Sequence, residues 1–230
     1  MKRPLDSCLF ESPRNGAVLD VGCFGFARVA QAAGLGRGDL RHAGVDFTDP
    51  GNVPVGVDFR RADLNHERLP FDDDSFDLVV ASHVLEHVRD PIGLVIDCLR
   101  VCRPGGRVYI EAPSERALFL PSMPFKFEAF HSLSFFDDPT HLSRPWTPQA
   151  LFRLARLLGC EPEVTKHQIS WLIRILSPAL IPLTLILRDA RRFEYWSWLT
   201  VGWSCYAVIR KPASLQGAPA LRYSIPPRGR

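Results

Sequence analysis

The sequence lacks the features of a disulfide-stapled, secreted or nucleic-acid-binding protein. Its six cysteines are scattered and form no C-x-x-C pair, which favours free thiols in a reducing cytoplasm over a disulfide framework. Lys2 and Arg3 are not followed by an apolar run, so we expect no signal peptide. The formal net charge is only +3 over 230 residues, so we expect no nucleic-acid partner.

A long uninterrupted apolar run is also missing. Residues 169–187 (ISWLIRILSPALIPLTLIL) approach the length of a membrane span, but Arg174, Pro178 and Pro182 interrupt them. Arginines follow, and then an aromatic edge typical of membrane interfaces, formed by Tyr195, Trp196, Trp198 and Trp203. Three interpretations of an apolar insert over residues 169–200 therefore stay open: a hairpin on a membrane surface, a helical insert packed on its own domain, or one packed on a second subunit.

The sequence does contain a series of apolar, β-rich segments that each run into a small or acidic residue. They are predicted as strands at residues 17–21, 43–47, 57–61, 76–81 and 107–112. Helical spacing of apolar residues predicts helices at 28–33 and 91–102, the second ended by the turn Pro104-Gly105-Gly106. Two closing strands are expected at 163–168 and 202–210. Strands alternating with helices predict an α/β fold, a doubly wound, mostly parallel sheet with helices on both faces.

Around this sheet we expect one domain, residues 16–211, with smaller appendages. Residues 1–15 are predicted as a lead-in and residues 212–230 as a flexible tail rich in Pro, Gly and Arg. Residues 113–146 are rich in Phe, Pro and His without a clean period, which predicts a lid or substrate loop. Thr147-Pro148 then predicts the start of a further helix.

The order of these segments carries a family resemblance. LPFDDDSFDLVVASHVLEHVRDP (residues 69–91) and LRVCRPGG (residues 99–106) resemble class I S-adenosylmethionine-dependent methyltransferases, over roughly residues 18–162. The resemblance implies a seven-stranded Rossmann-like sheet, S-adenosyl-L-methionine as cofactor, and methyl transfer to an O or N nucleophile. The apolar insert favours a small-molecule, sugar or lipid-linked glycan acceptor, handled in the cytoplasm or peripherally at the inner face of the membrane.

The resemblance also assigns cofactor roles to the first two strand ends. Asp20 and Gly22 would lie near the methionine part of the cofactor, with Gly25 in the same loop. Phe24 and Phe26 stand where the family usually has its second and third glycines, which is a departure. Asp46 would accept hydrogen bonds from both ribose hydroxyls, because a carboxylate offers paired acceptor oxygens to a vicinal diol.

The next two strand ends complete the expected cofactor site. By the same resemblance, Asp63 would accept from the adenine amino group, with the backbone of Leu64 alongside. The alternative for Asp63 is a structural cap of its own turn. Ser82, at the end of the fourth strand, would offer its carbonyl to the cofactor's ammonium group.

Histidines are the candidate catalytic groups. Methyl transfer needs in-line positioning and the removal of one proton from the acceptor, and histidine suits that base near neutral pH. His83 directly follows the fourth strand and is the first candidate, with His141 as the second. The reserves on the long loop are His131, Asp137 and Asp138.

The string His83-Val-Leu-Glu86-His87 could have a second use. On a helix, positions i, i+3 and i+4 share one face, and a related ExxEH set binds magnesium in some methyltransferases. An imidazole in place of the first carboxylate suits a transition metal better, and His141 could add a further ligand. The HxxEH zinc-protease interpretation is rejected, because the string directly follows a methyltransferase-like strand. We expect no metal, and keep His83, Glu86 and His87 as the alternative.

Two other functions remain as rivals. If the ring of Phe24 or Phe26 filled the cofactor cleft, the domain would be a binding scaffold that has lost catalysis. The other rival is a Rossmann-like nucleotide-sugar enzyme. Against it, the first loop lacks G-x-G-x-x-G and no Tyr-x-x-x-Lys pair follows the fourth strand.

Overall fold

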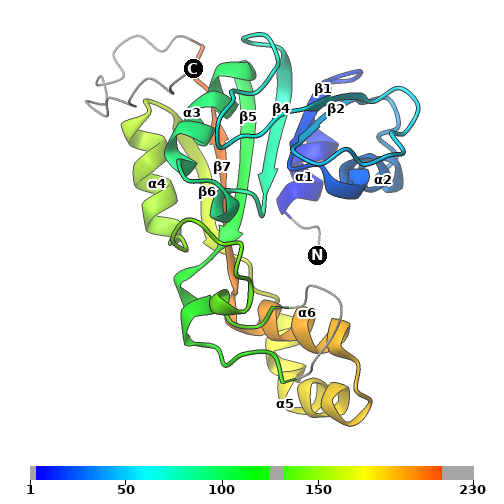
Figure 1. Ribbon diagram of the computed structural model, residues 1–230, viewed down its shortest axis with the longest axis vertical. Coiled ribbons are helices and arrows are strands. Elements are labelled where there is room, and N and C mark those ends of the chain that lie inside the picture. The colour runs from blue at the N-terminus through cyan, green and yellow to red at the C-terminus, as the bar shows by residue number, and fades with distance from the viewer. Residues whose placement is uncertain (1–3, 125–131, 214–230) are drawn as a thin grey trace.

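A computed structural model describes residues 4–124 and 132–213 of the chain (Figure 1). Its centre is a seven-stranded sheet with the order β3-β2-β1-β4-β5-β7-β6. The strands are β1 (Ala17–Val21), β2 (Arg41–Asp46), β3 (Asp58–Arg61), β4 (Phe76–Ser82), β5 (Cys102–Pro113), β6 (Glu161–His167) and β7 (Ser204–Arg210). Only the pairings of β7 are antiparallel. The predicted doubly wound, mostly parallel sheet is confirmed.

Helices cover both faces of the sheet, as expected. The α-helices are α1 (Pro4–Glu11), α2 (Ala27–Gly34), α3 (Pro91–Val101), α4 (Pro148–Leu157), α5 (Trp171–Ile186) and α6 (Ala190–Val201). Buried side chains of α1 and α2 join one core cluster, and those of α3 and α4 join the other. Thr147 caps α4 by accepting a hydrogen bond from the amide of Ala150, with Pro148 in the first turn, so the predicted helix start is confirmed.

The amino-terminal segment is more than a lead-in. Leu5, Cys8 and Leu9 of α1 are buried in the same cluster as Val18 and Tyr109 of the sheet. Their spacing of three and four residues is that of one helix face. The helix has only eight residues, so its stability comes from this packing more than from its own sequence.

The fifth strand begins earlier than the sequence indicates. Cys102 pairs with Phe76 and Arg107 with Leu78, so residues 103–106 loop out of the ladder between these pairs. Gly105 has φ +77°, which a glycine adopts without strain. The Pro-Gly-Gly segment is therefore an irregularity inside β5 and not a turn in front of it.

The strand order places a ligand site at one edge of the sheet. The chain winds outward from β1 in one direction and from β4 in the other, so the order reverses between these neighbours. In open α/β sheets, ligands bind beside the carboxyl ends of the strands at such a reversal. The carboxyl ends of β1 and β4 carry the Gly22 loop and His83.

Gly44 of β2 makes the close contact between the sheet and this loop. A Cβ there would lie 2.6 Å from the Sγ of Cys23, which is buried in the loop after β1. We expect Gly44→Ala to lower the free energy of unfolding by about 1–3 kcal/mol, the usual cost of overpacking. Gly38→Ala is the control, because nothing lies within 4 Å of its added Cβ. Equal thermal midpoints for the two variants would contradict this packing.

The apolar insert forms a helical hairpin. In Figure 1, α5 and α6 lie beyond the carboxyl ends of the strands, beside the part of the 113–146 loop that the structure describes. That loop contains two short 3₁₀ helices, η3 (Glu115–Phe119) and η4 (Phe135–Asp137). Within the described residues, none of the helices has the length and apolar character needed to cross a membrane. The predicted tail lies outside the described residues from position 214 onward.

Candidate active site

The loop after β1 is fixed to β2 and turns on two glycines. The amides of Gly22 and Cys23 both donate to the carbonyl of Val45, at 2.8 and 3.2 Å. Gly22 and Gly25 have φ near +70°, a conformation that other residues adopt with strain. The loop then enters α2, so the amino end of that helix lies behind it.

The rings of the two phenylalanines in this loop do not fill the space beside Gly25. Phe24 is 80 % exposed. Phe26 is buried and makes an edge-to-face contact of 6.0 Å with Phe59 of β3. Apart from its chain neighbours Phe24 and Phe26, no atom of the described chain lies within 4 Å of a Cβ built on Gly25. An obstructed cleft was the condition for the scaffold interpretation, and the structure does not show it.

Asp20 and Asp46 lie buried at the carboxyl ends of neighbouring strands. The pKa of Asp20 is raised to about 7, mainly because the carboxyl group is buried. Arg28, whose Nε lies 3.8 Å away, lowers this pKa, and the nearby charge of Asp46 raises it. Oδ1 of Asp46 accepts the amide of Thr48 at 2.9 Å. Two buried acids, of which Asp20 alone has an arginine within 4 Å, favour a ligand that carries positive charge.

Asp63, Leu64 and Ser82 lie where the sequence places them, after β3 and at the end of β4. The Asp63 carboxylate accepts the amide of Asn65 and contacts Nδ1 of His66, and these two hydrogen bonds lower its pKa. It therefore also caps its own turn, the structural alternative. The hydroxyl of Ser82 donates to Glu111 at 3.5 Å. The cofactor roles of these residues remain predictions.

His83 lies between two carboxylates, in a left-handed backbone conformation (φ +55°). Its Nδ1 is 3.3 Å from Glu86 Oε1 and its Nε2 is 3.6 Å from Glu111 Oε1. Burial alone would lower the pKa of His83, but the hydrogen bonds and charges of Glu111 and Glu86 outweigh it and raise the pKa to about 10. The ring thus carries a proton near neutral pH. A base role, which remains a prediction, requires that proton to leave first.

Glu111 is a site residue that the sequence analysis missed. This buried side chain accepts from the hydroxyls of Tyr109 (2.8 Å) and Ser204 (2.9 Å). Burial raises its pKa, yet His83, Tyr109 and Ser204 together lower it to about 2, so the carboxylate stays charged. The available signal was a lone acid at the end of the apolar strand VYIEAP.

Two tryptophans of the aromatic edge, Trp198 and Trp203, form a wall beside His83, in keeping with the interpretation that part of the insert packs on its own domain. Trp198 and Trp203 stack at 4.1 Å, and their rings lie 6.1 and 5.8 Å from that of His83. Their indole N–H groups donate to the carbonyls of Ser132 and Leu133 in the long loop. Because these polar groups have partners inside the protein, both rings belong to the site and not to an outer surface.

Ser82, His83, Glu111 and Trp198 line a common cavity of about 200 Å³. His83 and Glu111 lie on its sheet side, Arg28 on α2, and Tyr195 and Trp198 on α6. Gln168, Tyr195 and Leu199 also line an adjoining groove of about 1100 Å³, which runs to Trp171 and Leu172 of α5. The site is therefore a small chamber next to a larger groove, whose lining is mixed and becomes apolar toward Trp171 and Leu172 of α5.

His141 lies in a different cluster from His83. Its ring is beside His87, with centroids 5.0 Å apart, and Glu86 completes the group. Residues 83–87 do not form one helix face, because only η2 (Leu85–His87) is helical and His83 turns toward Glu111. The structure thus groups Glu86 and His87 with His141, which the sequence offered as a further ligand. His83 is outside this group, although its Nδ1 contacts Glu86 Oε1 at 3.3 Å. Of the reserve residues, Asp137 caps η4, Asp138 bonds Thr140, and His131 lies outside the described residues.

Comparisons with known proteins indicate a methyltransferase domain. Residues 19–110 match a family described as "Methyltransferase domain". A Mycolicibacterium smegmatis protein named as a probable S-adenosylmethionine-dependent methyltransferase is 32 % identical over 121 residues, 50 % of this chain and 44 % of that protein. The ubiquinone biosynthesis O-methyltransferase of Hahella chejuensis is 35 % identical over 101 residues, 40 % of this chain and 41 % of that one. The chain thus spans less than half of these relatives.

The fold agrees over nearly the whole chain. The crystal structure of an S-adenosylmethionine-dependent methyltransferase from Mesorhizobium loti superposes with a TM-score of 0.58 at 17 % identity, covering 89 % of this chain and 96 % of that one. S-adenosyl-L-methionine is the cofactor that this family and fold imply, and the buried acids and open glycine loop fit its positive charge. Residues 19–110 therefore form a methyltransferase domain, in a fold shared with S-adenosylmethionine-dependent methyltransferases of known structure.

Proposed function

We propose that this protein transfers a methyl group from S-adenosyl-L-methionine to an oxygen of a lipid-linked acceptor at a membrane surface. The observation that carries the proposal is the α5–α6 hairpin. Its outer side exposes large apolar residues, while its inner side forms part of the wall of the cavity that holds His83. One element would therefore contact lipid and the acceptor at once.

The exposed side of the hairpin is unusually apolar for a surface. Within α5 and the residue after it, large side chains between 41 and 78 % exposed are Trp171, Leu172, Ile175, Leu176, Leu183, Leu185, Ile186 and Leu187. Thr184 is the buried residue of that helix. Exposed apolar patches of this kind mark interaction sites, and the arginines Arg174, Arg188, Arg191 and Arg192 beside them suit anionic lipid headgroups.

The groove between the hairpin and the sheet gives an acceptor a route to the site. It runs from the exposed Trp171 and Leu172 to Gln168, which also lines the chamber of His83. At about 1100 Å³ it is at the large end for small-molecule pockets. A long apolar tail could lie in it while a polar head reaches His83 and Glu111.

The polar chamber favours an oxygen nucleophile. When bound, S-adenosyl-L-methionine supplies an electrophilic methyl group. Asp20 and Asp46 would hold the cofactor beside Ser82, and His83 with Glu111 would hydrogen-bond the acceptor's hydroxyl and orient it. Similarity to the ubiquinone biosynthesis O-methyltransferase supports the same atom type.

Vesicle binding tests the membrane part of the proposal. We expect the protein to co-sediment with phosphatidylglycerol-containing vesicles, and the double variant Ile175→Glu/Ile186→Glu to lose at least about tenfold in partitioning, since each buried isoleucine contributes about 1.5–3 kcal/mol. Val55→Glu is the matched control, because Val55 is a fully exposed apolar residue on another part of the domain.

Two results would contradict the membrane part of the proposal. Equal sedimentation of the wild type and the double variant would remove the hairpin from membrane binding. A wild type that ignores vesicles but elutes as a dimer, which the double variant converts to a monomer, would assign the apolar side to a second copy. Label from methyl-labelled S-adenosylmethionine entering the aqueous phase of a cell extract, and not the lipid phase, would overturn the acceptor class alone.

A further inference from the structure

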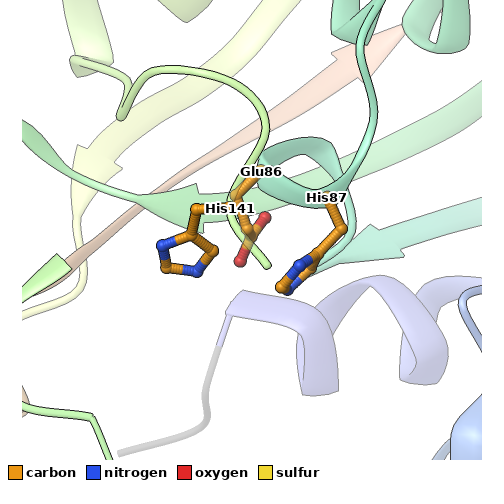
Figure 2. A group of neighbouring side chains, drawn as sticks. All are labelled: Glu86, His87 and His141. Atoms are coloured by element: carbon orange, nitrogen blue, oxygen red, sulfur yellow. The ribbon is translucent and has the colours of Figure 1, made fainter. Parts of the chain in front are cut away.

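Glu86, His87 and His141 form a compact group outside the chamber of His83. One ligand-type atom of each lies within 4.8 Å of the others, and Figure 2 shows the Glu86 carboxylate between the two imidazole rings. Glu86 is 1 % exposed, and both histidines are half-buried. Such a group brings together two nitrogen donors and one oxygen donor from two separate parts of the chain.

The Glu86 carboxylate is only half satisfied. Oε1 contacts Nδ1 of His83 at 3.3 Å, whereas Oε2 is buried without a hydrogen-bond partner in the described part of the chain. A buried carboxylate oxygen without a partner is costly, because it has lost its water and gained nothing in exchange. A cation beside Oε2 would remove this cost.

Both imidazoles are oriented as metal ligands usually are. Nδ1 of His141 lies 2.8 Å from the carbonyl of Phe135, and Nδ1 of His87 lies 3.0 Å from the hydroxyl of Thr140. If each Nδ1 donates its hydrogen to that oxygen, Nε2 keeps its lone pair. Nε2 of His141 lies 3.7 Å from Oδ2 of Asp138, which is beyond hydrogen-bond distance. Metal-binding histidines characteristically use their second nitrogen in this way, which fixes the tautomer and the ring.

The loop that carries His141 is tied to the turn that carries Glu86. The amides of Leu142 and Ser143 donate to the carbonyl of Glu86, at 2.7 and 3.1 Å, and the Ser143 hydroxyl donates to the carbonyl of Leu85. These bonds hold the two segments in register without any ion. The three candidate ligand side chains are therefore held in place before an ion binds, which lowers the entropic cost of binding it.

From these contacts we infer that Glu86, His87 and His141 bind a divalent transition-metal ion, through Oε2 of Glu86 and Nε2 of each histidine. Two imidazoles and one carboxylate are the ligand set of many zinc sites and of other first-row transition-metal sites. Magnesium and calcium prefer oxygen ligands, so this set selects against them. The ion would join the long loop to the turn after β4, at the outer side of the chamber wall.

Metal titration of untagged, EDTA-dialysed protein tests the site. We expect one Zn²⁺ per chain by calorimetry, a visible absorption band when Co²⁺ is used instead, and no saturable heat with Mg²⁺. His141→Ala and His87→Ala should each weaken Zn²⁺ binding about 100-fold or more, since losing even an outer partner of a metal ligand costs about 10–100-fold. His42→Ala is the control, because His42 lies on β2 and is not one of the three residues of the group.

The variants keep the test decisive even if one of them folds poorly. Glu86→Gln preserves the shape of the buried side chain and should also abolish the Co²⁺ band, and circular dichroism checks the fold of all four variants. Zn²⁺ that binds His141→Ala and His87→Ala as tightly as the wild type would overturn the inference. So would a wild type that binds no Zn²⁺ at all.

Discussion

Replacing Asp46 by alanine should weaken the binding of S-adenosyl-L-methionine about 100-fold or more, because two hydrogen bonds to a charged group contribute about 3–6 kcal/mol together. The carboxylate is buried at the carboxyl end of β2, and one of its oxygens already accepts the amide of Thr48. The remaining acceptor positions suit a ribose diol. Calorimetry with the purified chain measures the dissociation constant directly.

Asp49→Ala is the matched control for this experiment. Asp49 also accepts an amide two residues further on, from Gly51 at 2.9 Å, but it lies outside the strand end. It therefore reports any general loosening of the loop after β2, and we expect its affinity to stay within about threefold of wild type, as for most surface substitutions. If Asp46→Ala bound the cofactor like Asp49→Ala, the ribose assignment would be wrong, and Asp20 would become the main anchor.

Much of the fold was predictable because local pattern and tertiary structure agree. Residues 17–21 and 76–81 read as continuous apolar runs because β1 and β4 are buried on both faces of a parallel sheet. The grouping of Asp20, Asp46 and Ser82 at one edge was predictable because parallel strands end at the same edge, so position in a strand predicts position in space. Placing these candidate residues needs no knowledge of side-chain contacts.

The residues that were missed depend on contacts between distant segments. Glu111 looks like one acid in an apolar strand until Ser204, 93 positions later, donates to it. Trp203 resembles a membrane-interface residue until its N–H finds the carbonyl of Leu133. His141 joins Glu86 only because the long loop returns to the turn after β4. Periodicity carries no information about such pairings, since each is set by how the loop folds back on the sheet.

Replacing His83 should have the largest effect on methyl transfer. We expect His83→Ala to lower the transfer rate about 100-fold or more, within the range that a positioned acid–base group contributes. Asp46 and Asp20 remain in place, so the cofactor's dissociation constant should change little. The measurement is the initial rate of label transfer from S-adenosylmethionine into the acceptor phase, set beside cofactor binding by calorimetry. His42→Ala, at the opposite end of β2, is the control.

A second variant separates proton transfer from positioning. His83→Asn retains a hydrogen-bond donor between Glu86 and Glu111, and asparagine tolerates the left-handed backbone at this position better than most residues. It also keeps a side-chain partner for Glu86, whose other carboxylate oxygen has none, whereas alanine removes it. If His83→Asn were as active as wild type while His83→Ala were not, His83 would position the acceptor and move no proton. Equal loss in both variants, with unchanged cofactor binding, would assign the proton to the imidazole.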